Sequence, residues 1–133
     1  MRIIHSMAGA KHGGAEAFFT RLVLALHRVG LNQRVLLRPD PGREKLLAEV
    51  GLTAYTMPFG GKLDISTRLQ LRHQVACYKP NVVMSWMNRA AAFCPRAQGR
   101  FVHCGRLGGY YNLKYYRNCD HLIGNTPQFL SLW

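Results

Sequence analysis

Two adjacent glycines, Gly13 and Gly14, lie between a short apolar run and a long amphipathic segment in the stretch AGAKHGGAEAFF, residues 8–19. Because glycine has no β-carbon, an anion can approach its backbone closely, and a helix N-terminus adds unpaired N–H groups and partial positive charge. The pattern predicts a phosphate-binding loop, with Glu16 in the first helical turn, where a carboxylate suits the helix dipole. The spacing is neither G-x-G-x-x-G nor a Walker A sequence, and a plain turn followed by a capping Glu16 is the alternative.

A second glycine pair, Gly108 and Gly109, predicts a tight loop in GRLGGYYNLKYYR, residues 105–117. Tyr110 follows it with a flat ring that suits the apolar C–H patches of a sugar, and its hydroxyl group can form hydrogen bonds. Arg106 can meet an anionic group through its planar guanidinium. The two later tyrosines of this stretch have the same chemistry, and packing on one face of a short helix is the alternative explanation for them.

His103 is the one candidate for a proton carrier, and a buried histidine satisfied by its neighbours is the alternative. The four cysteines are spaced too widely for a zinc site, which usually needs close pairs, so we expect buried or half-buried free thiols in a reducing compartment. They are Cys77, Cys94, Cys104 and Cys119. We expect no metal and no cofactor, and we assign no catalytic residue.

These loops must be positioned by short apolar runs that alternate with segments of helical periodicity. Strands are predicted at residues 2–6, 33–38, 53–57, 81–86, 100–106 and 121–125. Helices are predicted at residues 14–30, 42–51, 64–78, 88–97 and 112–119, with one more after residue 126. The alternation predicts a Rossmann-like, three-layer α/β/α fold with a mostly parallel six-stranded sheet. In such folds ligands bind beyond the carboxyl ends of the strands.

Two helices carry further detail. The first is expected to bury the residues that share one face at helical spacing, which are Ala15, Phe18, Leu22, Ala25, Leu26 and Val29. In the helix predicted at residues 88–97, Pro95 is expected to shorten or kink the end.

The chain has 133 residues, which suggests one domain, and its net charge is +12. Such an excess favours anionic partners, either phosphate-bearing ligands or an anionic membrane surface. The basic residues are dispersed and no nucleic-acid-binding signature is present, so nucleic acid is not an expected partner. We find no membrane-spanning run and no secretory signal, and we expect a cytoplasmic protein, peripheral to the inner face of the membrane. The apolar ending QFLSLW and an exposed cleft or sheet edge also allow self-association.

The string HGGAE, after a first strand and before an amphipathic helix, resembles the N-terminal domain of glycosyltransferases with the GT-B fold, family 4 in particular. The stretch KPNVVMSW, residues 79–86, is similar to the family's P-D-V-V-H-x-H strand, with Asn81 in place of the acidic residue. The stretch CDHLIGNTP, residues 119–127, resembles its A-D-x-V-I-x-x-S element. Together these similarities run from Met1 to about Pro127, in the family's order.

The resemblance implies transfer of a sugar, with retention, from a nucleotide-sugar donor to a glycan or lipid-linked acceptor in cell-envelope polysaccharide or lipopolysaccharide synthesis. It implies that Gly13 and Gly14 face the donor diphosphate, with Glu16 in the same loop. The candidate acceptor-binding residues are Asn88, in a loop that lacks the family's histidines, and Arg106, Gly108, Gly109 and Tyr110 from the second glycine loop. The donor-binding half, with its pair of glutamates, has no match here. We therefore expect residues 1–133 to be a single Rossmann-like domain, the truncated N-terminal half of a GT-B fold, inactive alone.

A stand-alone Rossmann-like module that binds a phosphorylated small molecule or a nucleic acid is the alternative function. Titration of an oligonucleotide against salt separates the two hypotheses, because a steep salt dependence indicates many phosphate contacts.

Overall fold

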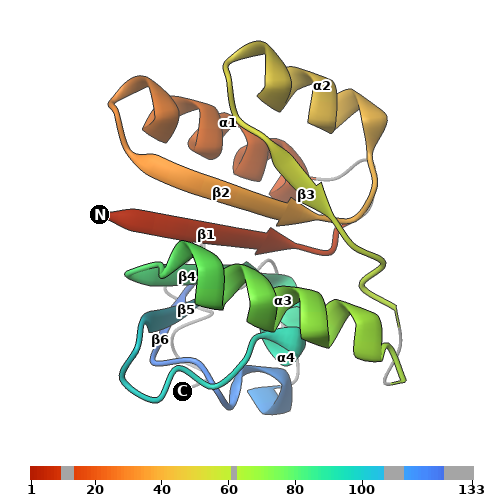
Figure 1. Cartoon of the computed structure of the whole chain (residues 1–133), viewed down its shortest axis with the longest axis vertical. Helices are drawn as coiled ribbons and strands as arrows, with labels where there is room; N and C mark the ends of the chain where they lie inside the picture. The colour runs from red at the N-terminus through yellow and green to blue at the C-terminus, as the bar shows by residue number, and fades with distance from the viewer. Residues whose placement is uncertain (10–13, 61–62, 107–112, 125–133) are drawn as a thin grey trace.

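Six parallel strands form one sheet in the part of the chain that the structure, a computed structural model, describes: residues 1–9, 14–60, 63–106 and 113–124 (Figure 1). The order across the sheet is β3-β2-β1-β4-β5-β6, and every neighbouring pair is parallel. The strands are β1 Arg2–Met7, β2 Asn32–Leu37, β3 Ala54–Thr56, β4 Val82–Trp86, β5 Val102–Arg106 and β6 His121–Ile123. The predicted fold class is confirmed.

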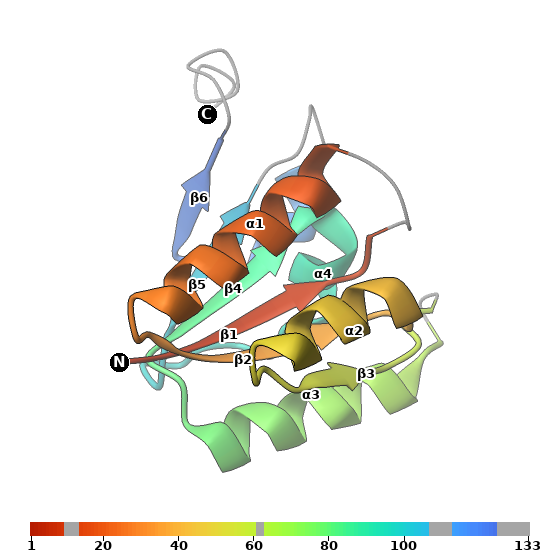
Figure 2. The ribbon, with the colours of Figure 1, turned by 90° about the horizontal axis from the view of Figure 1, so that it is seen from above.

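Helices cover both faces of this sheet. The helices α1 (Gly14–Arg28) and α2 (Pro41–Glu49) lie on one face, and α3 (Ile65–Tyr78) and α4 (Met87–Phe93) lie on the other (Figure 1). A short 3-10 helix, η1 (Leu113–Tyr116), precedes β6. Figure 2 looks onto α1 and α2, with the strand arrows pointing the same way beneath them. This is the three-layer arrangement that alternating strands and helices produce.

The sheet separates two apolar cores, because successive side chains of a strand point to opposite faces. On the side of α3 and α4, Ile4 of β1 packs in a buried cluster with Leu71 and Phe93. On the side of α1 and α2, Met7 of β1 packs in a second cluster with Phe19 and Trp86. Because both faces are covered, every residue of β1 after Arg2 is buried, including the polar His5 and Ser6.

The helix α1 buries a different stripe from the one predicted. Phe19 and Val23 are fully buried, whereas Phe18 is 39% exposed and Val29 is 78% exposed. Both stripes of this helix are apolar, so periodicity alone does not choose between them. Phe19 points to the core because its ring packs edge-on against Trp86, with the ring centroids 5.2 Å apart.

The helix ends follow local rules. Gly30 and Gly51, just after α1 and α2, both have a φ of 86°, a conformation that costs glycine little. Asp64 caps α3 by accepting a hydrogen bond of 3.0 Å from the backbone N–H of Thr67. The helix α4 ends at Phe93, two residues before Pro95, as expected. The helix predicted after residue 126 lies outside the described residues. No helix in the described ranges is long and apolar enough to cross a bilayer.

Candidate functional site at the carboxyl edge of the sheet

The carboxyl ends of β1 and β4 form the topological switch point of the sheet. From β1 the chain continues outward to β2 on one side, while β4 starts the series on the other side. The loops that leave β1 and β4 therefore diverge, which is where open α/β sheets bind ligands. The two strands end together, because Met7 and Trp86 form their last pair. Met87, directly after β4, has a φ of 68°, a strained value of the kind that clusters at functional sites.

Glu16 of α1 folds back onto the loop that follows β1. Its side chain is only 7% exposed. A β-carbon placed on Gly9 would lie 2.6 Å from Oε1 of Glu16, so the two residues pack in direct contact. Gly14 is the first residue of α1, and Gly13 lies outside the described residues. Sequence reasoning missed Gly9, although a third glycine in the same loop was available as a signal.

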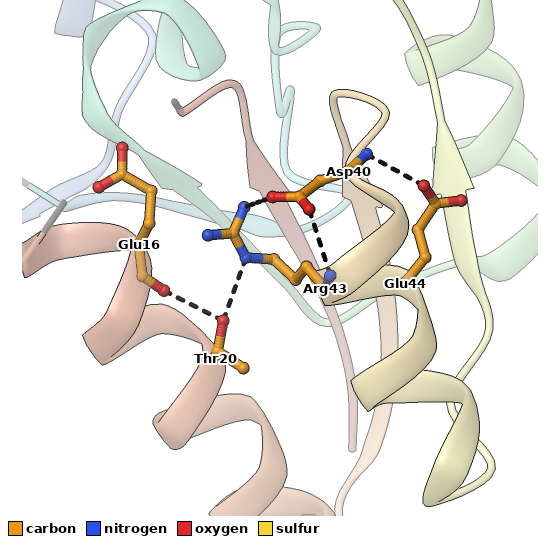
Figure 3. Close-up of polar contacts among 5 residues, drawn as sticks. All are labelled: Glu16, Thr20, Asp40, Arg43 and Glu44. Atoms are coloured by element: carbon orange, nitrogen blue, oxygen red, sulfur yellow. Dashed lines mark hydrogen bonds and ion pairs between the residues drawn. The ribbon is translucent and has the colours of Figure 1, made fainter. Parts of the chain in front are cut away.

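A network of polar contacts ties the first turns of α1 and α2 together (Figure 3). The hydroxyl group of Thr20 donates to the carbonyl oxygen of Glu16 at 3.1 Å and accepts from Nε of Arg43 at 3.2 Å. The guanidinium of Arg43 also forms an ion pair with Asp40 at 3.0 Å. Asp40 caps α2 by accepting from the backbone N–H of Arg43 at 3.3 Å, and its own N–H donates to Glu44 at 3.0 Å. The network fixes the orientation of both helix N-termini at this edge.

Arg106, the last residue of β5, lies at the switch point over two aromatic rings. Its guanidinium carbon is 5.2 Å from the ring centre of Phe18 and 5.7 Å from that of Trp86. These are cation–π distances, and they hold the side chain in place. Partial burial lowers the pKa of Arg106 from its usual value. The structure thus brings this predicted acceptor-binding residue next to the first turns of α1.

Trp86 is itself held by a chain of buried hydrogen bonds. Its indole Nε1–H donates to Nδ1 of His5 at 3.2 Å. The other ring nitrogen of His5 lies 2.8 Å from Oε1 of Gln33, whose side-chain amide donates to the carbonyl oxygen of Val23 at 2.9 Å. Since Nδ1 accepts, Nε2 carries the proton and donates to Gln33. Burial lowers the pKa of His5 to about 4, so the ring is neutral.

Two further arginines fix the loop that follows β3. Arg38 and Arg89 both donate to the carbonyl oxygen of Phe59, at 2.8 Å and 3.1 Å. Phe59 has a φ of 47° and a fully buried side chain, so both its backbone and its ring are constrained. The sequence does not single out these two arginines, because dispersed basic residues give no signal of a shared partner.

His103 lies in the core and not at this edge. The side chain is 0% exposed. Its Nδ1 lies 3.1 Å from the carbonyl oxygen of Asn118, which can only accept, so Nδ1 carries the proton. Nε2 then accepts from the hydroxyl group of Ser85 at 2.7 Å. Burial lowers the pKa of His103. This environment is that of a neutral histidine with both ring nitrogens partnered, and we assign it no proton transfer.

The thiols and other metal-binding side chains form no metal site in the described ranges, where no three His, Cys, Asp or Glu side chains come together. All four cysteines are free. Burial raises the pKa of Cys94 and of Cys119 to about 12, so both are protonated thiols. Cys77 departs from the expectation of burial, because it lies exposed on α3.

Of the predicted site residues, the structure brings Gly14, Glu16 and Arg106 to one edge, together with the backbone of Asn88 in the first turn of α4. Three predicted acceptor-binding residues lie outside the described residues, and these are Gly108, Gly109 and Tyr110. The same edge carries several guanidinium groups and the strained start of α4. Chemically, the arrangement suits an anion next to an aromatic surface.

No known family model matches the chain. Two curated relatives align along nearly its whole length. The lipopolysaccharide core biosynthesis glycosyltransferase LpsD of Rhizobium meliloti (strain 1021) is 37% identical over 135 residues, covering 98% of this chain and 38% of LpsD. LpsE of the same strain, which has the same description, is 36% identical over 129 residues, covering 96% of this chain and 37% of LpsE. The chain thus spans little more than a third of the length of these relatives.

Solved structures with the same fold include glycosyltransferases of the GT-B class. Acinetobacter baumannii MurG superposes with a TM-score of 0.69 at 13% identity, covering 96% of this chain and 42% of MurG. Anabaena Alr3699/HepE, solved in complex with UDP and glucose, has a TM-score of 0.69 at 15% identity, covering 98% of this chain and 40% of its own. At such identities the likeness establishes the fold, and in each case this chain matches part of a larger molecule.

Proposed function

We propose that this chain is the N-terminal, acceptor-side domain of a retaining glycosyltransferase of family 4. The complete enzyme transfers a sugar from a nucleotide-sugar donor to a glycan or lipid-linked acceptor in the synthesis of the lipopolysaccharide core. The observation that carries this proposal is the similarity to LpsD, which extends over 98% of the chain at 37% identity. A stand-alone module for nucleic acid or a phosphorylated ligand is not favoured, because that similarity extends over almost the whole chain.

The carboxyl edge supports the proposal through its charge and shape. In our proposal, backbone N–H groups at residues 13 and 14 offset the charge that develops on the departing nucleoside diphosphate. Glu16 keeps the loop after β1 against the helix by packing on Gly9. Arg106, held over Phe18 and Trp86, binds an anionic group of the acceptor. No general acid or base is assigned within the described residues.

We propose that the 133 residues alone do not catalyse sugar transfer. Such a transfer needs a donor-binding half that faces the acceptor-binding half across a cleft, and the chain covers only 38% of LpsD. Incubating the chain with a panel of nucleotide sugars and measuring release of the nucleoside diphosphate tests this. Turnover by the chain alone would contradict the proposal of inactivity.

A chimera tests the transfer itself. The segment of LpsD that aligns with this chain is replaced by residues 1–133, and the chimera is expressed in a Rhizobium meliloti strain that lacks LpsD. We expect restored extension of the lipopolysaccharide core, measured by mass spectrometry. Arg106→Gln in the chimera should lower the rate of sugar transfer by about tenfold or more. A loss of about 1.4 kcal/mol in the binding of the transition state lowers a rate about tenfold. The matched control is Arg21→Gln on the exposed side of α1, which should transfer normally. A chimera that accumulates normally and leaves the core unextended would overturn the proposal.

We also propose that the domain works in the cytoplasm at an anionic membrane surface. Three exposed apolar side chains gather at the start of α3: Leu63 is 92% exposed, Ile65 is 65% exposed and Leu69 is 57% exposed. Ile65 and Leu69 are four residues apart and so share a face of the helix. Apolar insertion combined with a net charge of +12 suits an anionic lipid surface. Leu63→Ser with Leu69→Ser should abolish sedimentation with vesicles of phosphatidylglycerol and phosphatidylcholine, and unchanged sedimentation would contradict this proposal.

Self-association through an open cleft or a sheet edge stays a prediction. The two edge strands, β3 and β6, have three residues each, and edges this short give little template for pairing with another chain. Analytical ultracentrifugation across a range of concentrations measures it directly.

A further inference from the structure

A groove of about 650 Å³ lies on the face of the sheet covered by α3 and α4, between α3 and the segment of residues 94–100 that follows α4. Four arginines line it: Arg68, Arg72, Arg96 and Arg100. Two come from α3 and two from the segment that follows α4, and Figure 1 shows these parts of the chain on the same side of the sheet. We call this the arginine groove. No residue assigned to the carboxyl edge lines it, and the two regions meet where Phe93 of the groove packs against Phe59, with the ring centroids 6.1 Å apart.

The arginine groove has little compensating negative charge, since the nearby carboxylate of Asp64, four residues before Arg68, interacts electrostatically with that one arginine. None of the residues that line it is an Asp or a Glu. The one ion pair found among the described residues joins Arg43 and Asp40, on the opposite face of the sheet. Four like charges around one concave surface repel one another, and a bound anion relieves that repulsion.

Two of the four arginines are held in place by the protein. Arg68 packs over the ring of Phe93, with its guanidinium carbon 4.9 Å from the ring centre. Arg100 donates to the carbonyl oxygens of Ala97 at 3.2 Å and Arg96 at 2.7 Å. Side chains that are ordered before binding lose less conformational entropy when a ligand arrives.

The side chains of the other two, Arg72 and Arg96, are left for a ligand. Both residues are exposed, and neither side chain has a hydrogen-bond or ion-pair partner within the described ranges. Gln98 and Asn118 add neutral polar groups to the lining. The groove therefore combines fixed positive charge at two positions with uncommitted guanidinium groups at two others.

We propose that the arginine groove binds a compact soluble anion that carries two or more neighbouring phosphate groups. A guanidinium fork matches two oxygens of one phosphate, so four arginines suit several phosphates better than a single carboxylate. The volume falls within the range of about 300–1,000 Å³ that is usual for small-molecule sites. This inference is independent of the proposed glycosyl transfer, since it uses no residue assigned to that reaction.

Inorganic tripolyphosphate is the probe for the test, with the 133-residue chain titrated by isothermal calorimetry. The variant Arg72→Gln with Arg96→Gln should bind about tenfold more weakly or worse, since it removes the two uncommitted forks. The matched control is Arg21→Gln with Arg28→Gln on α1, which removes the same charge from exposed positions on the other face. It should bind within about twofold of the original chain at the same ionic strength.

Three outcomes would overturn the proposal. One is the absence of tripolyphosphate binding to the original chain. Another is an equal loss in both double variants, which would indicate only the net charge. The third is a result that indicates a lipid surface instead of a soluble anion. In that case the original chain sediments with phosphatidylglycerol vesicles, the arginine-groove variant does not, and tripolyphosphate does not displace the original chain from the vesicles. Melting curves by circular dichroism verify that each variant is folded, which we expect because the substituted side chains are exposed.

Discussion

The carboxyl edge and the arginine groove are both basic, but they use their arginines differently. At the edge, Arg38 and Arg89 donate to one carbonyl oxygen, and Arg43 bridges two helices. In the groove, the side chains of Arg72 and Arg96 have no hydrogen-bond or ion-pair partner among the described residues. The charge at the edge therefore contributes to the fold as well as to any ligand site, whereas much of the charge in the groove is available only to a ligand.

The largest expected contrast comes from Trp86→Ala. Trp86 is 1% exposed and contacts the rings of Phe18, Phe19 and His5. Its removal leaves a cavity and leaves Nδ1 of His5 without its donor, so the free energy of unfolding should fall by about 3–5 kcal/mol. Urea unfolding followed by circular dichroism measures this loss. If Trp86→Ala costs no more than the double substitution in the groove, the structural difference between the two regions does not exist.

A second contrast comes from pH. The pKa of His5 is lowered from 6.5 to about 4 in the fold, so the unfolded chain binds the proton more readily than the folded chain. The stabilisation by neutral His5 is complete above about pH 6.5 and is lost as the pH falls toward about 4. Between about pH 7.5 and about pH 5, the free energy of unfolding should drop by about 2 kcal/mol from His5.

His103, whose pKa is also lowered by burial, adds to that loss in the same direction. Urea titrations at the two pH values measure the sum. The Arg72→Gln and Arg96→Gln variant serves as control, because its groove holds no histidine and its loss should equal that of the original chain. A free energy of unfolding that does not change with pH would show that neither histidine is held neutral by the fold.

Much of the architecture could be predicted, because parallel α/β order follows from alternating periodicities, glycine stops and proline breaks. The carboxyl edge was located for the same reason. Less could be predicted where two faces of one helix are equally apolar. Phe18 and Phe19 are neighbours in the sequence, and contact with Trp86 decides that Phe19 is the buried one. The hydrogen-bond chain of Trp86, His5 and Gln33 and the arginine groove could not be predicted either, since each joins residues far apart in the sequence.

A third contrast concerns the tight packing after β1. Gly9→Ala places a β-carbon 2.6 Å from Oε1 of Glu16, so the carboxylate must move. Since it lies at the end of a flexible side chain, the cost should be modest, about 1 kcal/mol. Adding Glu16→Ala removes the clash, so the double variant should be less destabilised than the sum of the two single changes. If the losses in the free energy of unfolding of the two single variants simply add in the double variant, the strain lies in the backbone and not in this contact. The carboxyl edge would then be no better packed than the groove.

The smallest expected effect tests the groove without a ligand. If its arginines repel one another and lack partners, Arg72→Gln with Arg96→Gln should raise the free energy of unfolding by about 0.3 kcal/mol at low ionic strength. The Debye length falls from about 30 Å at 0.01 M salt to about 3 Å at 1 M, so the gain should vanish as salt is added. Tripolyphosphate should reverse the order, because it stabilises only the chain that binds it. Thermal melts at two salt concentrations, with and without the probe, measure these differences. A variant that is less stable than the original chain under every condition would mean that these side chains contribute to the fold, as those at the carboxyl edge do.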